Sequence, residues 1–253
     1  MISLAGKRVL VTGATSGIGE ACARVFAEEW CALVLTGRRE DRLQSLGREL
    51  AELHGIELTT IVLDVRDLEG IRAVPWPEID LLINNAGLGL GLDPIQKGSI
   101  EEWDEMIDAN IKGLLYVTRA ILPGMVERGS GHVINLGSAA GHWVYPGGNV
   151  YCATKSAVKA LTEAMRLDLA GAGIRVSSVD PGMVETEFSV IRFRGDAARA
   201  KSVYAGMTPL TAEDVADAIL FCATRSPHVN INEVVMMPVD QAGIATVNRK
   251  KPA

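Results

Sequence analysis

The sequence has few of the features that mark secreted, membrane-spanning or nucleic-acid-binding proteins. Its 253 residues include only four cysteines, and no two of these are spaced as CxxC. Because disulfide-stabilised secreted domains are rich in paired cysteines, these thiols are typical of a protein from a reducing compartment. Basic residues number 25 against 31 acidic ones, and the net charge of −6 excludes a uniformly basic surface for phosphate backbones or anionic membranes.

Long hydrophobic runs and clustered histidines are also missing. No apolar stretch approaches the ~18 residues that a membrane-spanning helix needs. The N-terminal MISLAGKRVLVTG carries its charges within the first apolar stretch, unlike a cleavable signal, so we expect a cytoplasmic protein. The four histidines are scattered without the spacing of metal ligands. We therefore expect no metal site, and neither nucleic acid nor membrane as a partner.

What the sequence does contain is an alternation of short β-branched runs with longer amphipathic stretches, which is typical of a parallel sheet with crossover helices. Right-handed crossovers then predict a single doubly wound, Rossmann-type α/β domain with a parallel sheet of about seven strands. The expected strands are Arg8–Thr12, Ala32–Thr36, Leu58–Leu63, Asp80–Asn84, His132–Leu136, Ile174–Val179 and Glu233–Met237. The expected helices are Gly17–Glu29, Asp41–Leu53, Ser99–Arg128, Val150–Ala170 (capped by Asn149) and Thr211–Thr224 (capped by Thr211).

Two segments interrupt this alternation. In Arg66–Pro77 the prolines leave room for only a turn or two of helix. The second segment, Met183–Gly206, is long and basic and separates a strand from the next helix. Insertions at the carboxyl ends of strands in such sheets cover the ligand, so we expect a substrate lid here.

A glycine-rich turn, TGATSGIG, follows the first expected strand. Gly13 permits the tight turn, while Gly17 and Gly19 let the backbone approach a pyrophosphate and the helix pack on its strand. The helix start adds free N–H groups and the positive end of a dipole. Because the turn joins a strand to a helix, it predicts a dinucleotide site; the alternative is a plain tight turn.

The end of the second strand distinguishes between the two nicotinamide cofactors. An NAD site places an acidic residue about 20 residues beyond the glycines, where it binds the ribose 2′-hydroxyl. This sequence has Thr36-Gly37-Arg38-Arg39 there, and Arg38 offers a planar cationic fork for a 2′-phosphate. NADP(H) is therefore favoured; the alternative is a solvated basic pair opening the next helix.

A tyrosine and a lysine lie one helical turn apart in Tyr151-Cys152-Ala153-Thr154-Lys155. Such a pair is common on amphipathic surfaces, but Ser138 ends the preceding strand at the edge where ligands bind. Asn110 is a polar amide within a largely apolar helical stretch, where it either serves the site or is a buried amide bonded to neighbouring backbone.

These motifs occur together, in one order, along essentially the full chain. They are TGATSGIG (Thr12–Gly19), Asp64-Val65, Asn84-Asn85-Ala86-Gly87, Asn110, Ser138, YCATK (Tyr151–Lys155) and Pro181-Gly182. In this combination the sequence resembles the short-chain dehydrogenase/reductase family. The resemblance implies a Rossmann-type oxidoreductase that forms a homotetramer, with Asn110, Ser138, Tyr151 and Lys155 as its catalytic group.

The resemblance also implies how the cofactor is surrounded. Asp64-Val65 would line the adenine, Asn85 to Gly87 would back the cofactor, and Pro181 to Thr186 would meet the nicotinamide carboxamide. Lys155 would bind the nicotinamide ribose, and Asn110 would hold a water in a proton relay. The expected cofactor-binding residues are Gly13, Thr15, Ser16, Gly17, Ile18, Gly19, Arg38, Arg39, Asp64, Val65, Asn85, Ala86, Gly87, Tyr151, Lys155, Pro181, Gly182, Val184 and Thr186.

Hydride transfer to or from a carbon bearing oxygen requires a proton to move on or off that oxygen. A free tyrosine has a pKa of ~10, too high for a base at neutral pH. A cation at ~4 Å in an effective dielectric of ~20 is worth about 4 kcal/mol, so Lys155, helped by the oxidised nicotinamide, is expected to lower the pKa of Tyr151 to ~7. Ser138 would hydrogen-bond and orient the substrate oxygen.

Several further stretches resemble one branch of the family, the NADP-dependent 3-hydroxy acid dehydrogenases. They are GSAAGHWVYPGGNVY (Gly137–Tyr151), TEFSVIRFRGD (Thr186–Asp196), PLTAEDVADAI (Pro209–Ile219) and HVNINEVVMMPVDQA (His228–Ala242). Substrates of that branch, such as serine, allo-threonine, 3-hydroxypropionate and malonic semialdehyde, carry an anionic group near the reacting carbon. Arg192 or Arg194 of the lid is expected to bind this anion, and Tyr145 and His142 to line the pocket; the alternative is that these arginines are merely solvated and the aromatic residues merely pack under the lid.

Three other functions stay open. A sulfoacetaldehyde reductase forming isethionate would differ only in the anion it recognises. A reductase of 3-ketoacyl thioesters or bulky ketones would need an open apolar groove under the lid. A non-catalytic NADP-binding sensor would keep the glycine turn and Arg38 but could dispense with Ser138, Tyr151 or Lys155, all of which are present.

Overall fold

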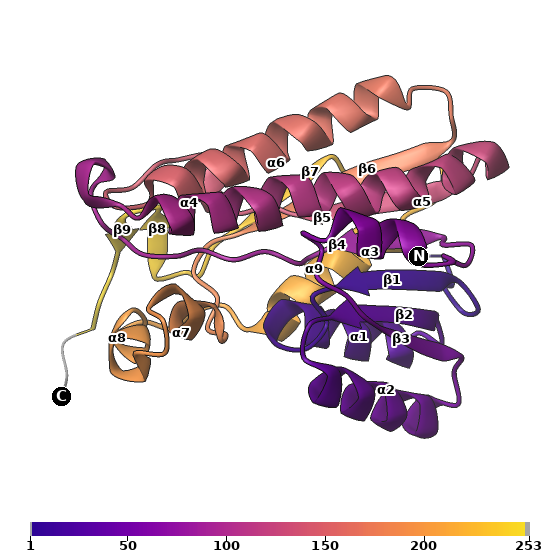
Figure 1. Ribbon diagram of the computed structural model, residues 1–253, viewed down its shortest axis with the longest axis horizontal. Helices are drawn as coiled ribbons and strands as arrows, with labels where there is room; N and C mark the ends of the chain where they lie inside the picture. Colours follow the sequence, from indigo (N-terminus) through magenta and orange to yellow (C-terminus); the bar gives the residue numbers. More distant parts are fainter. Residues whose placement is uncertain (1, 251–253) are drawn as a thin grey trace.

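The computed structural model describes residues 2–250, and a parallel sheet forms its centre (Figure 1). The sheet has seven strands in the order β3-β2-β1-β4-β5-β6-β7, and every neighbouring pair is parallel. The strands are β1 (Arg8–Thr12), β2 (Ala32–Gly37), β3 (Leu58–Val62), β4 (Leu81–Asn84), β5 (Gly131–Leu136), β6 (Ile174–Pro181) and β7 (Glu233–Met236). The predicted α/β, Rossmann-type fold is confirmed, and the strand order reverses between β1 and β4, where such sheets bind ligands.

Helices cover both faces of the sheet, because side chains alternate between the faces along each strand. Val9 and Val11 of β1 pack in one core with α1, α2 and α9, whereas Leu10 packs in the other core with α3, α5 and α6. In Figure 1, α4, α5 and α6 lie on one side of the strands and α1 and α2 on the other. The helices are α1 (Gly17–Glu28), α2 (Glu40–His54), α3 (Leu68–Ala73), α4 (Ile100–Ile107), α5 (Leu114–Arg128), α6 (Asn149–Asp168) and α9 (Ala212–Ala223).

The helix predicted over Ser99–Arg128 is interrupted. A π-helical segment, η2 (Asp108–Gly113), separates α4 from α5. Within it, the side chain of Asn110 bonds the backbone of Leu88, and a Cβ on Gly113 would lie 2.6 Å from Cγ2 of Val65. The wider turn therefore accommodates two close contacts with neighbouring loops that periodicity does not reveal, and π-helical turns of this kind are frequent at functional sites.

The two predicted helix caps have different outcomes. Thr211 caps α9 as expected: its Oγ1 accepts from the N–H of Asp214, whose carboxylate accepts from the N–H of Thr211. The prediction for Asn149 is wrong, because Asn149 is the first residue of α6 and Gly148 precedes it. The Asn149 side chain instead donates to the carbonyl of Asp93, tying the helix start to a neighbouring loop.

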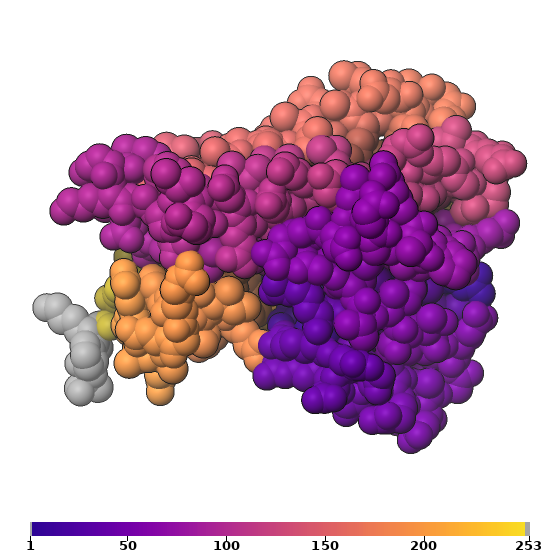
Figure 2. Space-filling view, in the orientation of Figure 1, coloured from indigo at the N-terminus to yellow at the C-terminus, as the bar shows by residue number. Residues whose placement is uncertain are grey.

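The segment Met183–Gly206, expected as a lid, contains two short helices that its sequence did not reveal, α7 (Phe188–Arg192) and α8 (Ala197–Ser202). In Figure 2 this segment forms the orange lobe beside the indigo and violet N-terminal half. A small antiparallel pair, β8 (Gln241–Gly243) and β9 (Thr246–Val247), was not predicted either, and the 3₁₀ turns are η1 (Ile95–Lys97) and η3 (Ala139–Gly141). Over residues 2–250, no helix combines the length and apolar character needed to span a membrane.

Candidate active site

A cleft of about 430 Å³ opens where the carboxyl ends of the strands face the lid. All the predicted cofactor-binding residues except Gly19 line it, as do Ser138, Tyr151 and Lys155. Asn110, Tyr145, Arg192 and Arg194 do not belong to its walls. The residues that line the cleft are distant in sequence, since they run from Gly13 to Ile191. The structure brings them together from β1, β2, β4, β5, α6 and the lid.

The glycine-rich turn has the geometry that a bound pyrophosphate requires. Gly13 and Gly17 adopt positive φ angles of 68° and 53°. A Cβ on Gly19 would lie 2.3 Å from the carbonyl oxygen of Gly13, so Gly19 permits close packing behind the turn rather than lining the cleft. Ser16 precedes α1 without capping it through its side chain, which leaves first-turn N–H groups available to an anion.

A second loop is fixed against this turn by hydrogen bonds. The Thr12 hydroxyl accepts from the backbone N–H groups of Asn85 and Ala86, both at 3.0 Å. The Asn85 side-chain amide donates to the carbonyl oxygens of Thr12 (2.8 Å) and Gly13 (3.2 Å). The carboxyl ends of β1 and β4 therefore form one rigid wall, and this wall fits a dinucleotide at the switch point of the sheet.

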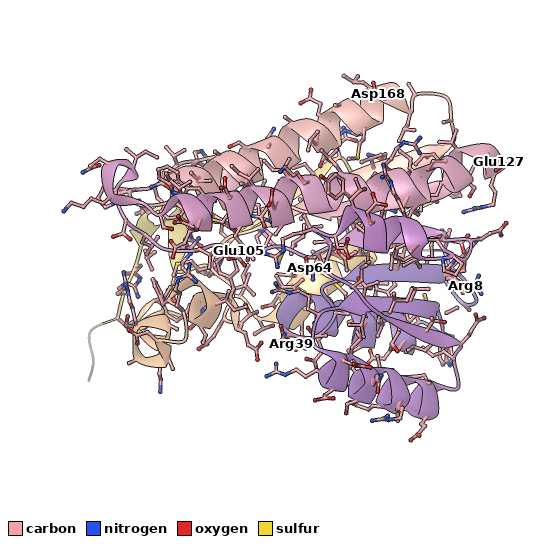
Figure 3. The ribbon with its side chains drawn as sticks, viewed as in Figure 1. Arg8, Arg39, Asp64, Glu105, Glu127 and Asp168 are labelled. Carbon is pink, nitrogen blue, oxygen red and sulfur yellow. The ribbon has the colours of Figure 1, made fainter. Side chains whose placement is uncertain are left out.

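The two arginines after β2 have different environments. Arg38 has a side chain 55% exposed, with its Nη1 3.8 Å from Asp64 Oδ2. Arg39 is tied down, because it donates to Thr15 Oγ1 (3.1 Å), Ser16 Oγ (2.6 Å) and Glu187 Oε2 (2.7 Å). Arg39 and Asp64 lie on the side of the sheet that the lid faces (Figure 3). These cations fit a 2′-phosphate, as predicted from the sequence.

Glu187, at the start of α7, was missed by sequence reasoning. Its two carboxylate oxygens accept from Arg39 and from Arg42 of α2, each at 2.7 Å. Hydrogen bonds from Arg42 and Arg39 lower the pKa of Glu187 to about 2, so the carboxylate is ionised at neutral pH. This bridge joins the lid to the opposite wall of the cleft, and a separation of more than 140 residues conceals it in the sequence.

The proposed catalytic side chains converge at the inner end of the cleft. Ser138 follows β5 and is buried, and its Oγ accepts from the N–H of Ala140. Tyr151 and Lys155 extend from the first turns of α6, and Lys155 Nζ donates to the carbonyl oxygen of Leu136 at 2.8 Å. Only 7% of Lys155 is exposed, so this ammonium is held in place away from bulk solvent.

The pKa values of this pair differ from the sequence-based expectation. Burial raises the pKa of Tyr151 to about 12, opposed by the positive charge of Arg192 and by a hydrogen bond with Ser138. Burial lowers the pKa of Lys155 to about 8, opposed by the negative charge of Asp180. The side chains alone do not bring the pKa of Tyr151 to ~7, because burial of the phenolate outweighs the positive charge of Arg192. The expected joint effect of Lys155 and the oxidised nicotinamide stays a prediction.

Asn110 satisfies its amide within the protein. Its Oδ1 accepts from the N–H of Leu88, and its Nδ2 donates to the carbonyl of Leu88 and to Thr154 Oγ1. Thr154 in turn donates to the carbonyl oxygen of Tyr151. The side chain of Asn110 therefore joins the β4 loop to the helix that carries Tyr151, which places it as a positioning residue beneath the cleft.

The two lid arginines proposed for substrate binding are separated by the structure. The Arg192 guanidinium lies 4.7 Å from the ring centroid of Tyr151 and 4.9 Å from that of Phe188. Its Nε and Nη2 are buried and, within residues 2–250, have no hydrogen-bond partner. Arg194, by contrast, is 60% exposed and donates to Glu102 at 2.8 Å. Arg192 is thus the lid cation with unsatisfied donors beside Tyr151.

The two aromatic residues expected to line the pocket also have different positions. Tyr145 lies close to Arg192: burial raises the pKa of the Tyr145 phenol and the charge of Arg192 opposes this. His142 is directed elsewhere, because its Nε2 lies 2.7 Å from Asp180 Oδ2. Neither His142 nor Tyr145 lines the cleft, and His142 is instead bound to the buried carboxylate of Asp180 on β6.

Comparisons with known proteins agree with this geometry. The family model of the short chain dehydrogenases matches residues 7–195. The chain is 51% identical to the NADP-dependent 3-hydroxy acid dehydrogenase YdfG of Salmonella typhi, over 92% of this chain and 96% of that protein. It is 48% identical to sulfoacetaldehyde reductase 2 of Chromohalobacter salexigens, over 92% and 95% of the two chains. A solved closed form of serine dehydrogenase complexed with NADP⁺ is 48% identical, with a TM-score of 0.90 over 97% of this chain and 100% of that one.

Proposed function

The chain belongs to the short-chain dehydrogenase/reductase family, and from that premise we propose that it is an NADP(H)-dependent oxidoreductase of small anionic 3-hydroxy acids and the corresponding semialdehydes. The observation that carries the substrate class is Arg192, whose buried Nε and Nη2 have no partner among residues 2–250 and lie beside Tyr151. A buried guanidinium with unused donors favours an anion as its partner.

The cofactor supplies or accepts the hydride, and the protein contributes binding, orientation and proton transfer. The turn at Gly13 to Gly19 would hold the pyrophosphate, and Arg38 with Arg39 the 2′-phosphate. Asp64 and Val65 would line the adenine, and Pro181 to Thr186 would meet the nicotinamide carboxamide.

In the reduction, Ser138 Oγ donates a hydrogen bond to the substrate carbonyl oxygen and orients it. Tyr151 Oη gives its proton to that oxygen as the hydride reaches the carbon, and takes the proton back in the reverse reaction. Lys155 places a positive charge behind the phenol and is itself fixed by the Leu136 carbonyl oxygen. Asn110 holds the helix that carries Tyr151 through Thr154.

Arg192 orients the substrate through its anionic group. A guanidinium forms two parallel hydrogen bonds to a carboxylate, and such charge-assisted bonds are about twice as strong as neutral ones. The packing of Arg192 over Tyr151 and Phe188 sets the anion close to the proton donor. This arrangement suits a substrate whose carboxylate is two or three atoms from the reacting carbon.

A second candidate is the reduction of sulfoacetaldehyde, favoured by the 48% identity to a sulfoacetaldehyde reductase. A tetrahedral sulfonate presents three acceptors and can also engage the donors of Arg192. Reduction of bulky ketones or acyl thioesters is disfavoured, because the unpaired buried donors of Arg192 would then meet an apolar chain.

The proposal is tested by measuring NADPH oxidation with malonic semialdehyde, sulfoacetaldehyde, an acetoacetyl thioester and a bulky uncharged ketone. Reverse assays use serine, 3-hydroxypropionate and isethionate with NADP⁺. We expect kcat/KM for one of the small anionic aldehydes to exceed that of both larger substrates by at least ~10²-fold, about 3 kcal/mol. A preference for the thioester or the bulky ketone would contradict the proposal.

Arg38 is predicted to set the preference for NADPH over NADH. Replacing it in Arg38→Ser removes charge-assisted hydrogen bonds to the 2′-phosphate, each worth about 1.5–3 kcal/mol, so kcat/KM for NADPH should fall roughly 10- to 100-fold. The value for NADH should change little. Arg48→Ser, on the exposed surface of α2, is the control and should alter neither cofactor. Equal losses with NADPH and NADH would show that Arg38 does not recognise the phosphate.

We also propose that the protein works as a cytoplasmic homotetramer, as the family resemblance implies. The support is that apolar side chains are exposed on the outer helices: Leu115 and Val126 on α5 and Leu167 on α6 are 37%, 42% and 72% exposed. Exposed apolar groups on neighbouring helices favour association between copies.

A further inference from the structure

A buried carboxylate lies behind the catalytic serine and lysine. Asp180, the penultimate residue of β6, is 2% exposed and is bonded by His142 Nε2 (2.7 Å) and Ser178 Oγ (3.2 Å). A Cβ on Gly137 would lie 1.8 Å from Asp180 Oδ1, so this carboxylate packs directly against the Gly137 backbone. Gly137 is the link between Leu136, whose carbonyl oxygen binds Lys155, and Ser138.

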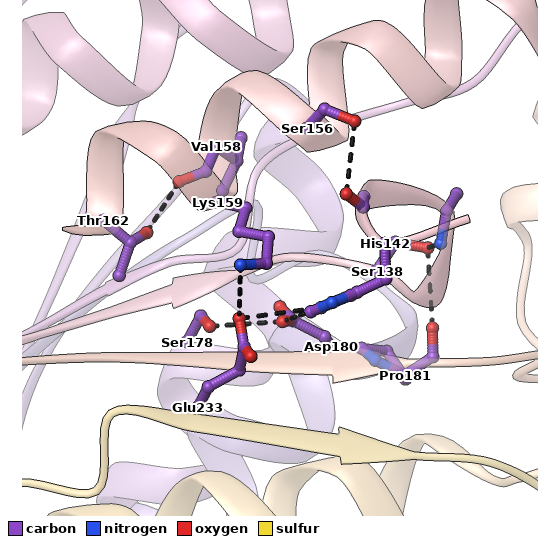
Figure 4. A network of polar contacts seen from close by, with 12 residues as sticks. Ser138, His142, Ser156, Val158, Lys159, Thr162, Ser178, Asp180, Pro181 and Glu233 are labelled. Carbon is purple, nitrogen blue, oxygen red and sulfur yellow. Dashed lines mark hydrogen bonds and ion pairs between the residues drawn. The ribbon is translucent and has the colours of Figure 1, made fainter. Parts of the chain in front are cut away.

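A chain of charged groups connects Asp180 with the surface (Figure 4). His142 Nε2 is 3.6 Å from Glu233 Oε1 of β7, and Lys159 Nζ of α6 is also 3.6 Å from that oxygen. Exposure of the side chains rises outward, from 2% for Asp180 to 12% for His142, 32% for Glu233 and 39% for Lys159. The titratable groups around Asp180 are thus His142, Glu233 and Lys159, together with Lys155.

The fold has assembled a histidine and two carboxylates that lie far apart in sequence, with their donor atoms within 4.8 Å of one another. The scattered histidines of the sequence gave no indication of this. The short His142–Asp180 hydrogen bond and the approach of Lys159 to Glu233 already engage these atoms. The group is therefore explained as a polar network, and its innermost member faces the active site.

We propose that Asp180 is a positioning residue for the hydride-transfer reaction: its buried carboxylate, oriented by His142, keeps Lys155 protonated and fixes the Gly137–Ser138 backbone at the substrate oxygen. This inference rests on the proposed function. The 2.7 Å contact with His142 Nε2 and the hydrogen bond from Ser178 Oγ hold the carboxylate in one orientation. The negative charge of Asp180 opposes the effect of burial on the pKa of Lys155, which is consistent with this role.

The test compares Asp180→Asn with His142→Gln. Asp180→Asn keeps the shape of the side chain and removes its negative charge, whereas His142→Gln keeps the carboxylate and a hydrogen-bond donor beside it. We expect Asp180→Asn to move the pH at which kcat falls, as Lys155 loses its proton, downward by about one unit, the order of the shift that losing one nearby negative charge produces. His142→Gln should leave the pH at which kcat falls unchanged. A uniform loss of kcat at every pH in Asp180→Asn, or equal shifts in both variants, would overturn the inference.

A second readout does not depend on turnover. Lysine side chains can be labelled with an isotope and titrated by NMR, with the Lys155 signal assigned from a Lys155→Met variant. The pKa of Lys155 should fall in Asp180→Asn and remain at about 8 in His142→Gln. An unchanged titration in Asp180→Asn would overturn the inference even in an active enzyme. If the enzyme turned over none of the carbonyl substrates, the proposed function would be contradicted. The titration of Lys155 would still test the role of Asp180, because it does not depend on turnover.

Should Asp180→Asn not fold, Glu233→Gln removes the more exposed negative charge of the same network. Its side chain is 32% exposed, so solvent screens it, and we expect the pKa of Lys155 to fall by a smaller amount in the same direction. A rise, or no change, would overturn the inference.

Discussion

Replacing Tyr151 by phenylalanine is expected to lower kcat by about 10³-fold, within the 10²–10⁴-fold range that a positioned general acid contributes. The substitution removes only the oxygen that exchanges the proton. The ring can still pack against Phe188, whose centroid is 5.5 Å away, and beneath Arg192. NADPH affinity, measured by fluorescence titration, should therefore change no more than about twofold, while steady-state assays in both directions report the loss of kcat.

Tyr116→Phe is the matched control, because Tyr116 is a partly buried residue of α5 that does not line the cleft. This variant should retain the kcat of the unmodified enzyme. Retention of near-normal kcat in Tyr151→Phe would remove Tyr151 from the proton transfer. A parallel loss of NADPH binding would instead indicate a structural role.

Replacing Arg192 by alanine is expected to reduce kcat/KM for the anionic aldehyde by about 10²-fold, since a charge-assisted contact of this kind is worth about 1.5–3 kcal/mol. The loss should be larger for charged substrates, because an uncharged aldehyde of the same size makes no such contact and shares only the effect of losing the Arg192 charge beside Tyr151. Steady-state assays of malonic semialdehyde and its uncharged analogue measure both effects. For the anionic aldehyde, the kcat/KM of Arg192→Lys should lie between those of the unmodified enzyme and Arg192→Ala, since an ammonium keeps the charge but loses the planar fork.

Arg194→Ala distinguishes substrate binding from a general loss of positive charge on the lid. Arg194 is bonded to Glu102 and mostly exposed, so its removal should change kcat/KM for either substrate by less than about twofold. An equal effect of Arg192→Ala on the charged and uncharged substrates would dismiss Arg192 as the anion-binding residue.

Much of the fold could be predicted because its local signals agree with one another. The apolar run of β1, the positive-φ glycines and the start of α1 each follow from neighbouring residues, so the dinucleotide turn was recognisable from the sequence. The capping box at Thr211 is equally local. By contrast, the π-helical segment around Asn110 depends on Leu88 and Val65, which come from other loops.

The same distinction applies to the site. Residue types at known motif positions predicted which side chains meet at the cleft, but not their protonation. Burial of Tyr151 raises its pKa more than the positive charge of Arg192 lowers it, and the extent of burial depends on tertiary packing. The bridge from Glu187 to Arg39 and the bond from His142 to Asp180 join residues 148 and 38 positions apart, and no sequence pattern links them.

The central claim is that binding of the oxidised cofactor lowers the pKa of Tyr151 and so allows this residue to exchange its proton with the substrate. Phenolate formation can be followed by ultraviolet difference absorbance between the unmodified protein and Tyr151→Phe, with and without NADP⁺. Without the cofactor, the pKa of Tyr151 should lie at about 12, since burial holds the proton on. With NADP⁺ it should fall by about 3 units, because a further cation at ~4 Å from the phenol in an effective dielectric of ~20 is worth about 4 kcal/mol, and oxidation should then accelerate as pH rises through the lowered pKa. An identical titration in both states would contradict the account.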